Sequence, residues 1–154
     1  MNKYFVAALA VCLLFLAGYA SAREKKIKRS DLPPAVEKTV VAQSAGATIR
    51  GFSTEKENGQ TLYEAEMTVN GHSKDVSMTA DGSVVEVEEQ VALDSLSPEV
   101  KAGLLAKAGK GKILKVESLT KKDKLVAYEA KIETDGKKSE IQVGPDGKPL
   151  DHEE

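Results

Sequence analysis

A nine-residue string that occurs twice constrains this chain more than any other feature. Residues 63–71 read YEAEMTVNG, and 65 residues later residues 128–136 read YEAKIETDG. In both strings Tyr, Ala and a large apolar residue alternate with charged or polar residues, which is the pattern of a β-strand with one buried face. Each string ends in Asn-Gly or Asp-Gly, dipeptides that tolerate the positive φ angles of a two-residue hairpin turn. The duplication therefore predicts one β-hairpin in each half of the chain.

A predicted helix precedes the hairpin in each half. The first begins near Pro34 and the second near Pro98, and proline suits the first helical position because the N–H that it lacks would be unpaired there. Apolar residues then recur at matching positions in the two halves: Val36, Val40 and Val41, and Val100, Leu104 and Leu105. Helices of about ten residues do not persist without a packing surface, so we expect each to cover a sheet.

Glycine turns predict further strands beyond each hairpin. Asp81-Gly82 and Asp146-Gly147 follow the partner strands, and the first of these turns leads to a strand containing Val85 and Val87. In the second half Pro149 shortens the corresponding strand, because proline cannot donate to a sheet ladder. We therefore predict an α+β fold of two tandem repeats, 31–93 and 94–154. Each repeat is expected to be a helix followed by an antiparallel four-stranded β-meander, with the helices packed on one face of the sheet.

The N-terminus has the features of a secretory signal peptide. Lys3 precedes an apolar run, and Ala20-Ser21-Ala22 provides the small residues that a signal peptidase reads. The run is shorter than the roughly 20 residues of a membrane-spanning helix. We therefore assign residues 1–22 as a signal peptide and expect a periplasmic or secreted protein with no stable membrane anchor. Cleavage would remove Cys12, the only cysteine, so disulfides and thiolate sites are excluded from the mature chain.

Residues 23–30, REKKIKRS, form a predicted basic leader. The segment has one apolar residue and no periodicity, so we expect it either to be solvated or to touch an anionic surface or partner. The first repeat is acidic, with 11 acidic and 4 basic residues, and the formal net charge of the whole chain is −2. This charge balance disfavours nucleic-acid binding.

The residues required for catalysis or metal binding do not occur in a recognisable pattern. The two histidines, His72 and His152, have no partner at metal-ligand spacing, and the chain contains no Gly-x-Ser-x-Gly motif. The Asp-Gly turns lack the ligand spacing of an EF-hand. We therefore predict no catalytic, cofactor-binding or metal-binding residues, and no enzyme activity.

Two groups of surface residues are candidates for partner binding. The first is the outward face of the two repeated strands, and the second is a lysine-rich segment of the second repeat. Side chains at i and i+2 on an exposed strand share solvent, so Glu64 and Glu66 are expected to keep ordinary pKa values. The candidate face comprises Glu64, Glu66, Glu129, Lys131 and Glu133, and the candidate basic patch comprises Lys110, Lys112, Lys115, Lys121, Lys122 and Lys124.

The ordered recurrence of helix, Tyr-x-Ala-x-apolar strand, Asn/Asp-Gly turn and final Asp-Gly turn resembles the PepSY domain. In tandem it also resembles the PepSY-like proteins that are related in fold to β-lactamase inhibitory protein. The resemblance covers residues 32–150 and implies a helix-backed antiparallel sheet that binds or inhibits a peptidase or another protein. It implies no catalytic or cofactor residue. The chain has no Trp, whereas aromatic anchors often dominate tight interfaces.

Three functions follow as hypotheses. The first is a non-enzymatic protein, monomeric or weakly dimeric, that binds or inhibits a protein partner through the exposed sheet face and hairpin loops. The alternative is a small-ligand or ion-binding module of the cell envelope. A third is a hydrolase that uses exposed carboxylates such as Glu64 and Glu66.

Overall fold

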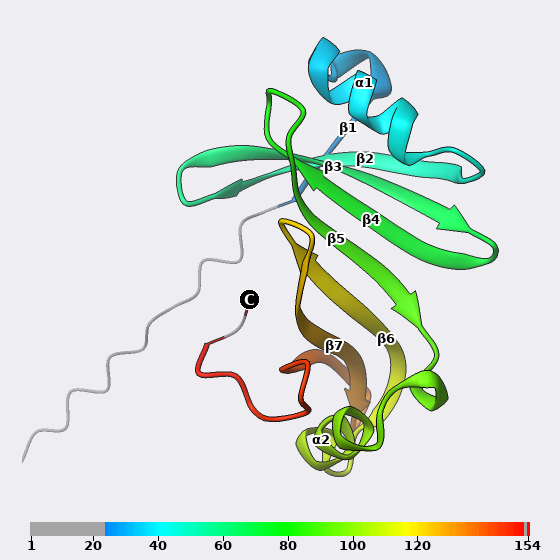
Figure 1. Ribbon diagram of the computed structural model, residues 1–154, viewed down its shortest axis with the longest axis vertical. Helices are drawn as coiled ribbons and strands as arrows, with labels where there is room; N and C mark the ends of the chain where they lie inside the picture. The colour runs from blue at the N-terminus through cyan, green and yellow to red at the C-terminus, as the bar shows by residue number, and fades with distance from the viewer. Residues whose placement is uncertain (1–23, 153) are drawn as a thin grey trace, which may run out of the picture.

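The computed structural model describes residues 24–152 and 154 of the chain, so the predicted signal peptide lies outside the described residues. The framework is one eight-stranded antiparallel sheet in which each strand pairs with its neighbours in sequence order (Figure 1). The strands are β1 (Lys25–Ile27), β2 (Thr48–Glu57), β3 (Gln60–Val69), β4 (His72–Met78), β5 (Val84–Val91), β6 (Lys112–Lys121), β7 (Lys124–Thr134) and β8 (Lys137–Val143). Helix α1 (Pro34–Gln43) precedes β2, and α2 (Pro98–Ala108) precedes β6. Within the described part of the chain no helix is long and apolar enough to span a membrane.

The predicted fold of two repeats, each a helix with its own four-stranded meander, is wrong. Instead, a strand, a 3-10 turn, an α-helix and three strands follow one another twice along a single sheet. The 3-10 turns are Arg29–Asp31 and Leu93–Ser95. Strand β5 joins the halves, because it pairs with β4 on one side and with β6 on the other. After β8 the chain makes a turn at Gly144–Lys148, and the described residues beyond it form no further strand. The GPDGKPL sequence has no apolar alternation, and its prolines have no N–H to donate.

The leader contributes a strand. The side chains of Lys25 and Lys26 are exposed, as a solvated leader predicts, whereas Ile27 is partly buried. These residues pair with Phe52, Ser53 and Thr54 of β2. Ile27 packs against the core beneath α1, and the Arg29 guanidinium donates to both carboxylate oxygens of Glu37, at 2.6 and 3.1 Å. Strand pairing along the edge of β2, the contact of Ile27 with the core and the Arg29–Glu37 ion pair together hold this segment in place.

Both helices cover the same face of the sheet. Val76 pairs with Val87, and Val91 pairs with Val116, and residues directly opposite on neighbouring strands point to the same side. Figure 1 shows α1 and α2 at opposite ends of the long axis. One core lies under each helix. The first comprises Val36, Val40, Phe52, Ala65, Met67, Val76 and Met78, and the second comprises Val100, Leu104, Ala108, Val116, Ala130, Ile132 and Val143.

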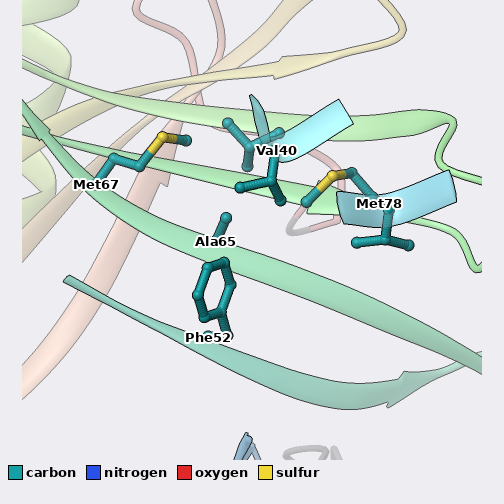
Figure 2. Close-up of a cluster of buried hydrophobic side chains, with 7 residues drawn as sticks. Val40, Phe52, Ala65, Met67 and Met78 are labelled. Atoms are coloured by element: carbon teal, nitrogen blue, oxygen red, sulfur yellow. The ribbon is translucent and has the colours of Figure 1, made fainter. Parts of the chain in front are cut away.

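Figure 2 shows the first core at close range, with Val40 of α1 above Ala65 of β3 and between Met67 and Met78. Ala65 is fully buried, and its small side chain leaves room for the helix to approach the sheet. Tyr63 and Tyr128, which begin the duplicated strings, are partly buried against the two cores. The face of the strands that the alternation predicted to be buried is therefore the face that packs against the helices.

The glycine turns have two structural environments. At the predicted hairpin turns the φ angles are positive at Asn70 and Gly71 and again at Asp135 and Gly136, as a two-residue turn requires. The later turns lie against the helices. A Cβ on Gly82 would lie 2.6 Å from the carbonyl oxygen of Ala35, and one on Gly147 would lie 2.2 Å from that of Glu99. Each helix therefore rests on the backbone of an Asp-Gly turn.

Candidate binding face

The face of the sheet that points away from the helices holds a hollow of about 430 Å³, which we call the acidic hollow. Residues from β2 and β3 near one edge of the sheet and from β7 and β8 at the other edge line it together, so the sheet curves around this face. Its lining contains eight carboxylates and two lysines: Glu24, Lys26, Glu55, Glu64, Glu66, Asp75, Glu88, Glu129, Lys131 and Glu140.

A row of like charges crosses the hollow. Glu66 of β3 is paired with Asp75 of β4, and Asp75 is paired with Glu88 of β5. Directly opposite side chains in an antiparallel pair have Cβ atoms only about 5 Å apart, and like charges at that spacing are destabilising. Three adjacent strands thus present carboxylates that repel one another when all are ionised.

Lysines neutralise only the edges of this arrangement. Lys26 reaches Glu66 at 3.5 Å, and Lys131 reaches Glu140 at 3.4 Å. Within residues 24–152 and 154, no ion pair within 4.0 Å involves Glu64, Asp75 or Glu88. Among the described residues, these three central carboxylates therefore have no direct cationic partner.

Glu117 of β6 is buried close to Asp75 and Glu88 and differs from them because it is paired. Its side chain is 2% exposed, and its oxygens lie 2.5 Å from the ammonium of Lys115 and 3.8 Å from that of Lys131. The hydroxyl of Ser73 donates to the same carboxylate at 3.2 Å. A buried carboxylate needs such partners, so we interpret Glu117 as a structural anchor for the two lysines.

Burial and mutual repulsion raise the pKa values of the central carboxylates. Burial is the main cause that raises the pKa of Glu88 to about 8, and the charges of Glu129 and Glu117 add to it. Burial followed by the charge of Asp75 raises the pKa of Glu64 to about 7. Burial also raises the pKa of Asp75 and that of Glu129. The expectation of an ordinary pKa is therefore wrong for Glu64, because the curved sheet removes its carboxylate from bulk water.

Replacing Glu88 by glutamine is expected to stabilise the fold at alkaline pH. In the unfolded chain the carboxyl ionises near 4.5, whereas in the folded chain it holds its proton to about pH 8. The folded state therefore binds more protons between these values, and stability is full below about pH 4.5 and falls as the pH rises through about 8. Because solvent screens a partly exposed group, we expect Glu88→Gln to gain about 1–2 kcal/mol near pH 8.5 and almost nothing near pH 4.5.

Urea unfolding of both proteins at the two pH values measures this gain. Asp123→Asn makes the same change of charge in an exposed turn and should be nearly neutral at both values. An equal gain for Glu88→Gln at both pH values would contradict the buried-carboxylate explanation.

The structure brings four of the five predicted face residues together. Glu64, Glu66, Glu129 and Lys131 line the acidic hollow. Glu133 lies on the same face of β7 as Glu129 and Lys131. It is near the far end of the strand, opposite Lys112 and Lys138, and does not line the hollow. Sequence reasoning missed the other members, Glu24, Lys26, Glu55, Asp75, Glu88 and Glu140. For Glu55, Asp75, Glu88 and Glu140 the signal was the polar phase of the neighbouring strands, whereas Glu24 and Lys26 belong to the leader, whose sequence has no periodicity.

The six residues of the predicted basic patch do not form one surface. Lys112 and Lys121 lie at opposite ends of β6, and a ten-residue strand is about 33 Å long. Lys115 is held by Glu117, while Lys121 lies 3.4 Å from Glu86 of β5. Lys122 and Lys124 belong to the β6–β7 turn and the start of β7, and Lys110 precedes β6.

Two groups of carboxylates, one within the hollow and one that includes the buried Glu117, have the spacing to share a hard cation. Oxygens of Glu24, Glu64 and Glu66 lie within 4.8 Å of one another, and so do those of Asp75, Glu88 and Glu117. Divalent ions such as calcium take oxygen ligands of this kind. A lysine or arginine side chain has the same charge complementarity and can bind several carboxylates at once.

Comparison with known proteins identifies the fold and leaves the family open. Neither a protein-family model nor a curated protein matches the chain. A Bacteroides eggerthii protein described as periplasmic is similar in structure, with a TM-score of 0.62 and 19% identity over 77% of this chain and 86% of its own. A BLIP-like protein from Bacteroides fragilis has a TM-score of 0.55 and 19% identity over 75% of this chain and 81% of its own. A DUF2874 family protein from Bacteroides ovatus has a TM-score of 0.58 and 21% identity over 77% and 84% of the two chains.

These similarities show that the chain has a BLIP-like fold. They agree with the part of the resemblance that concerned β-lactamase inhibitory protein, and they do not confirm the resemblance to the PepSY domain. At such low identity they establish fold alone. Function must therefore be argued from the acidic hollow.

Proposed function

We propose that this chain is a non-enzymatic, periplasmic or secreted binding protein whose acidic hollow holds lysine or arginine side chains of a protein partner. The row formed by Glu66, Asp75 and Glu88 carries this proposal. Like charges placed directly opposite one another cost stability in the free protein, and a cationic side chain placed among them would relieve that repulsion.

The shape of the face supports a protein partner. The hollow opens on the side of the sheet that the helices leave uncovered, and it extends from β1 to β8. Charge complementarity of this kind accelerates encounter with a basic partner and sets the orientation of the complex. The lack of Trp means that electrostatic contacts would contribute more than aromatic anchors, so we expect affinity that falls with added salt.

Three further points are consistent with this role. The predicted signal peptide would export the chain, and one structural neighbour is described as periplasmic. Another neighbour is described as BLIP-like. Inhibition of a peptidase or of another enzyme is the more specific form of the proposal, in which the bound segment would belong to the target enzyme.

Affinity capture with the predicted mature chain tests the proposal. Residues 23–154 and the double variant Glu66→Lys, Glu129→Lys would be incubated with periplasmic extract of the host at low and moderate salt. We expect a basic protein on the original chain that is lost from the variant and that, once purified, binds the original chain directly. Asp123→Lys with Asp151→Lys makes the same change of charge outside the hollow and should retain the partner. Equal capture by both variants, or no captured protein at either salt concentration, would contradict the proposal.

A divalent cation is the second candidate occupant. Two sets of three carboxylates favour it, because within each set the oxygens lie within 4.8 Å of one another. Native mass spectrometry of protein purified from its host, before and after treatment with a chelator, distinguishes the candidates. A bound mass that the chelator removes supports the ion-binding or small-ligand module. A mass equal to that of the polypeptide alone, together with unchanged calorimetry upon addition of calcium or magnesium, sets this alternative aside.

A further inference from the structure

We propose that β8 pairs with β8 of a second copy of this chain, so that the protein forms a two-fold symmetric dimer through one edge of its sheet. This inference is independent of the proposed function, because it concerns the main chain at an edge of the sheet rather than the occupant of the acidic hollow. It depends on which edge is open, on which main-chain groups point outward, and on the order of the charged residues along β8.

The two edges of the sheet differ in how well they are protected. Strand β1 has three residues, two of which are exposed lysines, and its neighbour β2 has a bulge between Ile49 and Gly51. Short strands, lysines and bulges are devices that prevent an edge from pairing with another chain. Strand β8 has seven residues in unbroken register with β7, and no described segment pairs with its outer side. The open edge of the sheet is therefore β8.

The turn between β7 and β8 fixes which residues of β8 direct their main-chain groups toward β7. It contains two residues, so the flanking residues Thr134 and Lys137 exchange hydrogen bonds. In an antiparallel pair such positions alternate with positions whose N–H and C=O groups point away from the partner strand. Ser139 and Ile141 therefore bond to β7. The residues whose main-chain groups point to the outer side are Lys138, Glu140 and Gln142.

One contact in the structure agrees with this assignment. The ammonium of Lys107 in α2 donates to the main-chain oxygen of Gln142 at 2.9 Å, which is possible because that oxygen does not bond to β7. The same contact occupies the C-terminal end of the edge, whereas residues 137–140 are exposed. The main-chain groups of Lys138 and Glu140 are thus the ones that remain for a further strand.

Charge selects one register for two antiparallel copies of β8. The open positions, Lys138 and Glu140, must face each other or themselves across the two-fold axis. A register centred on Lys138 would place two lysines directly opposite each other, and one centred on Glu140 would do the same with two glutamates. Like charges in this arrangement are destabilising, whereas opposite charges are stabilising. Only the register centred on Ser139 places Lys138 of each copy opposite Glu140 of the other.

The other side chains fit this register. Residues at the positions between the hydrogen-bonded pairs come closest, with Cα atoms about 4.5 Å apart. Ser139 would face Ser139 of the second copy at the axis, and its small side chain permits this approach. The aliphatic part of Lys137 would lie beside Ile141 of the other copy, which is only partly buried. Apolar contact would therefore add to the main-chain hydrogen bonds and the ion pairs.

The symmetry of this pairing has a consequence for the whole molecule. The two-fold axis of an antiparallel pair is perpendicular to the sheet, so both copies keep their helices on one face and their acidic hollows on the other. A two-fold dimer is closed and does not grow into a filament. The contact is confined to one short strand from each copy, so we expect a dimer that dissociates upon dilution.

Sedimentation equilibrium of residues 23–154 tests the dimer at protein concentrations from about 5 to about 500 µM. We expect the average mass to rise from that of a monomer toward that of a dimer. Lys138→Glu and Glu140→Lys should each weaken dimerisation at least about ten-fold, because each variant places like charges opposite each other. An equal mixture of the two variants should restore the dimer, because every glutamate then faces a lysine.

A control variant and a second measurement make the test specific. Lys38→Glu makes the same change of charge as Lys138→Glu at an exposed position of α1, and it should dimerise as the original chain does. Hydrogen exchange should show that the amides of Lys138 and Glu140 are protected only at high protein concentration. The amides of Ser139 and Ile141 should be protected at every concentration, because they bond to β7.

Three outcomes would overturn the proposal. The first is a monomeric mass at every concentration, including the case in which a protein from the extract protects the β8 amides, because the edge would then pair with a different chain. The second is a dimer that the single variants and their mixture form equally well. The third is a dimer that protects the amides of β1 instead of those of β8. None of them bears on the occupant of the acidic hollow, which the capture experiment tests separately.

Discussion

Gly82→Ala is expected to lower the free energy of unfolding by about 3 kcal/mol or more. Its φ angle is +82°, which disfavours any residue with a side chain, and a Cβ would lie 2.6 Å from the Ala35 carbonyl oxygen and 3.0 Å from the Thr39 hydroxyl. The Thr39 hydroxyl also donates to the Gly82 carbonyl oxygen at 2.7 Å. A methyl group would therefore push α1 away from the first core, in addition to straining the turn.

Gly71→Ala is the matched control for this prediction. The φ angle of Gly71 is +86°, and a Cβ there would meet no atom within 4 Å. Its substitution should cost only the backbone strain, about 1 kcal/mol. Urea unfolding of the two variants gives the comparison, and equal losses would show that the contact with α1 does not matter.

Leu104→Ala is expected to cost about 3–4 kcal/mol and to weaken both halves of the molecule. Leu104 is a fully buried residue of α2, so its truncation leaves a cavity in the second core. Strand β5 carries the effect further, because Val87 packs against the first core, Val91 packs against the second, and both belong to this strand. We expect one thermal transition that moves as a whole.

Hydrogen exchange checks this coupling residue by residue. Amides of β3, in the first half, should lose protection in Leu104→Ala together with those of β7. Leu105→Ala is the control, since Leu105 is the next residue of α2 and 50% exposed, and it should cost less than about 1 kcal/mol. Two separate transitions, of which Leu104→Ala moves only one, would show that the halves unfold independently.

The alternation of residue types was sufficient to place individual side chains on the correct face. Ala65 and Ala130 lie in the cores, whereas Glu64 and Glu129 lie in the acidic hollow. The hairpin turns could be predicted equally well, because Asn-Gly or Asp-Gly between two alternating segments is typical of a two-residue hairpin turn. Both features depend on the local geometry of the backbone, which a short stretch of sequence specifies.

The lysine-rich segment shows where such reasoning stops. Lys115 and Lys121 are close in sequence and appeared to belong to one surface. The structure pairs Lys115 with the buried Glu117 and Lys121 with Glu86 of a different strand. Charge counted along the chain does not reveal which acidic residues the neighbouring strands bring alongside.

The sequence by itself determined strands β2 to β8, their buried and exposed faces, the helix starts and the glycine turns, because each depends on periodicity or on the φ angles of one or two residues. Only the tertiary structure decided that β5 would join both halves into one sheet, that Lys25–Ile27 would add a strand, and that Glu64 and Glu129 would face the same hollow. Strand pairing and sheet curvature arise from hydrogen bonds and twist between distant segments. The local pattern is compatible with many such pairings, so it could not select the one that buries these carboxylates and raises their pKa values.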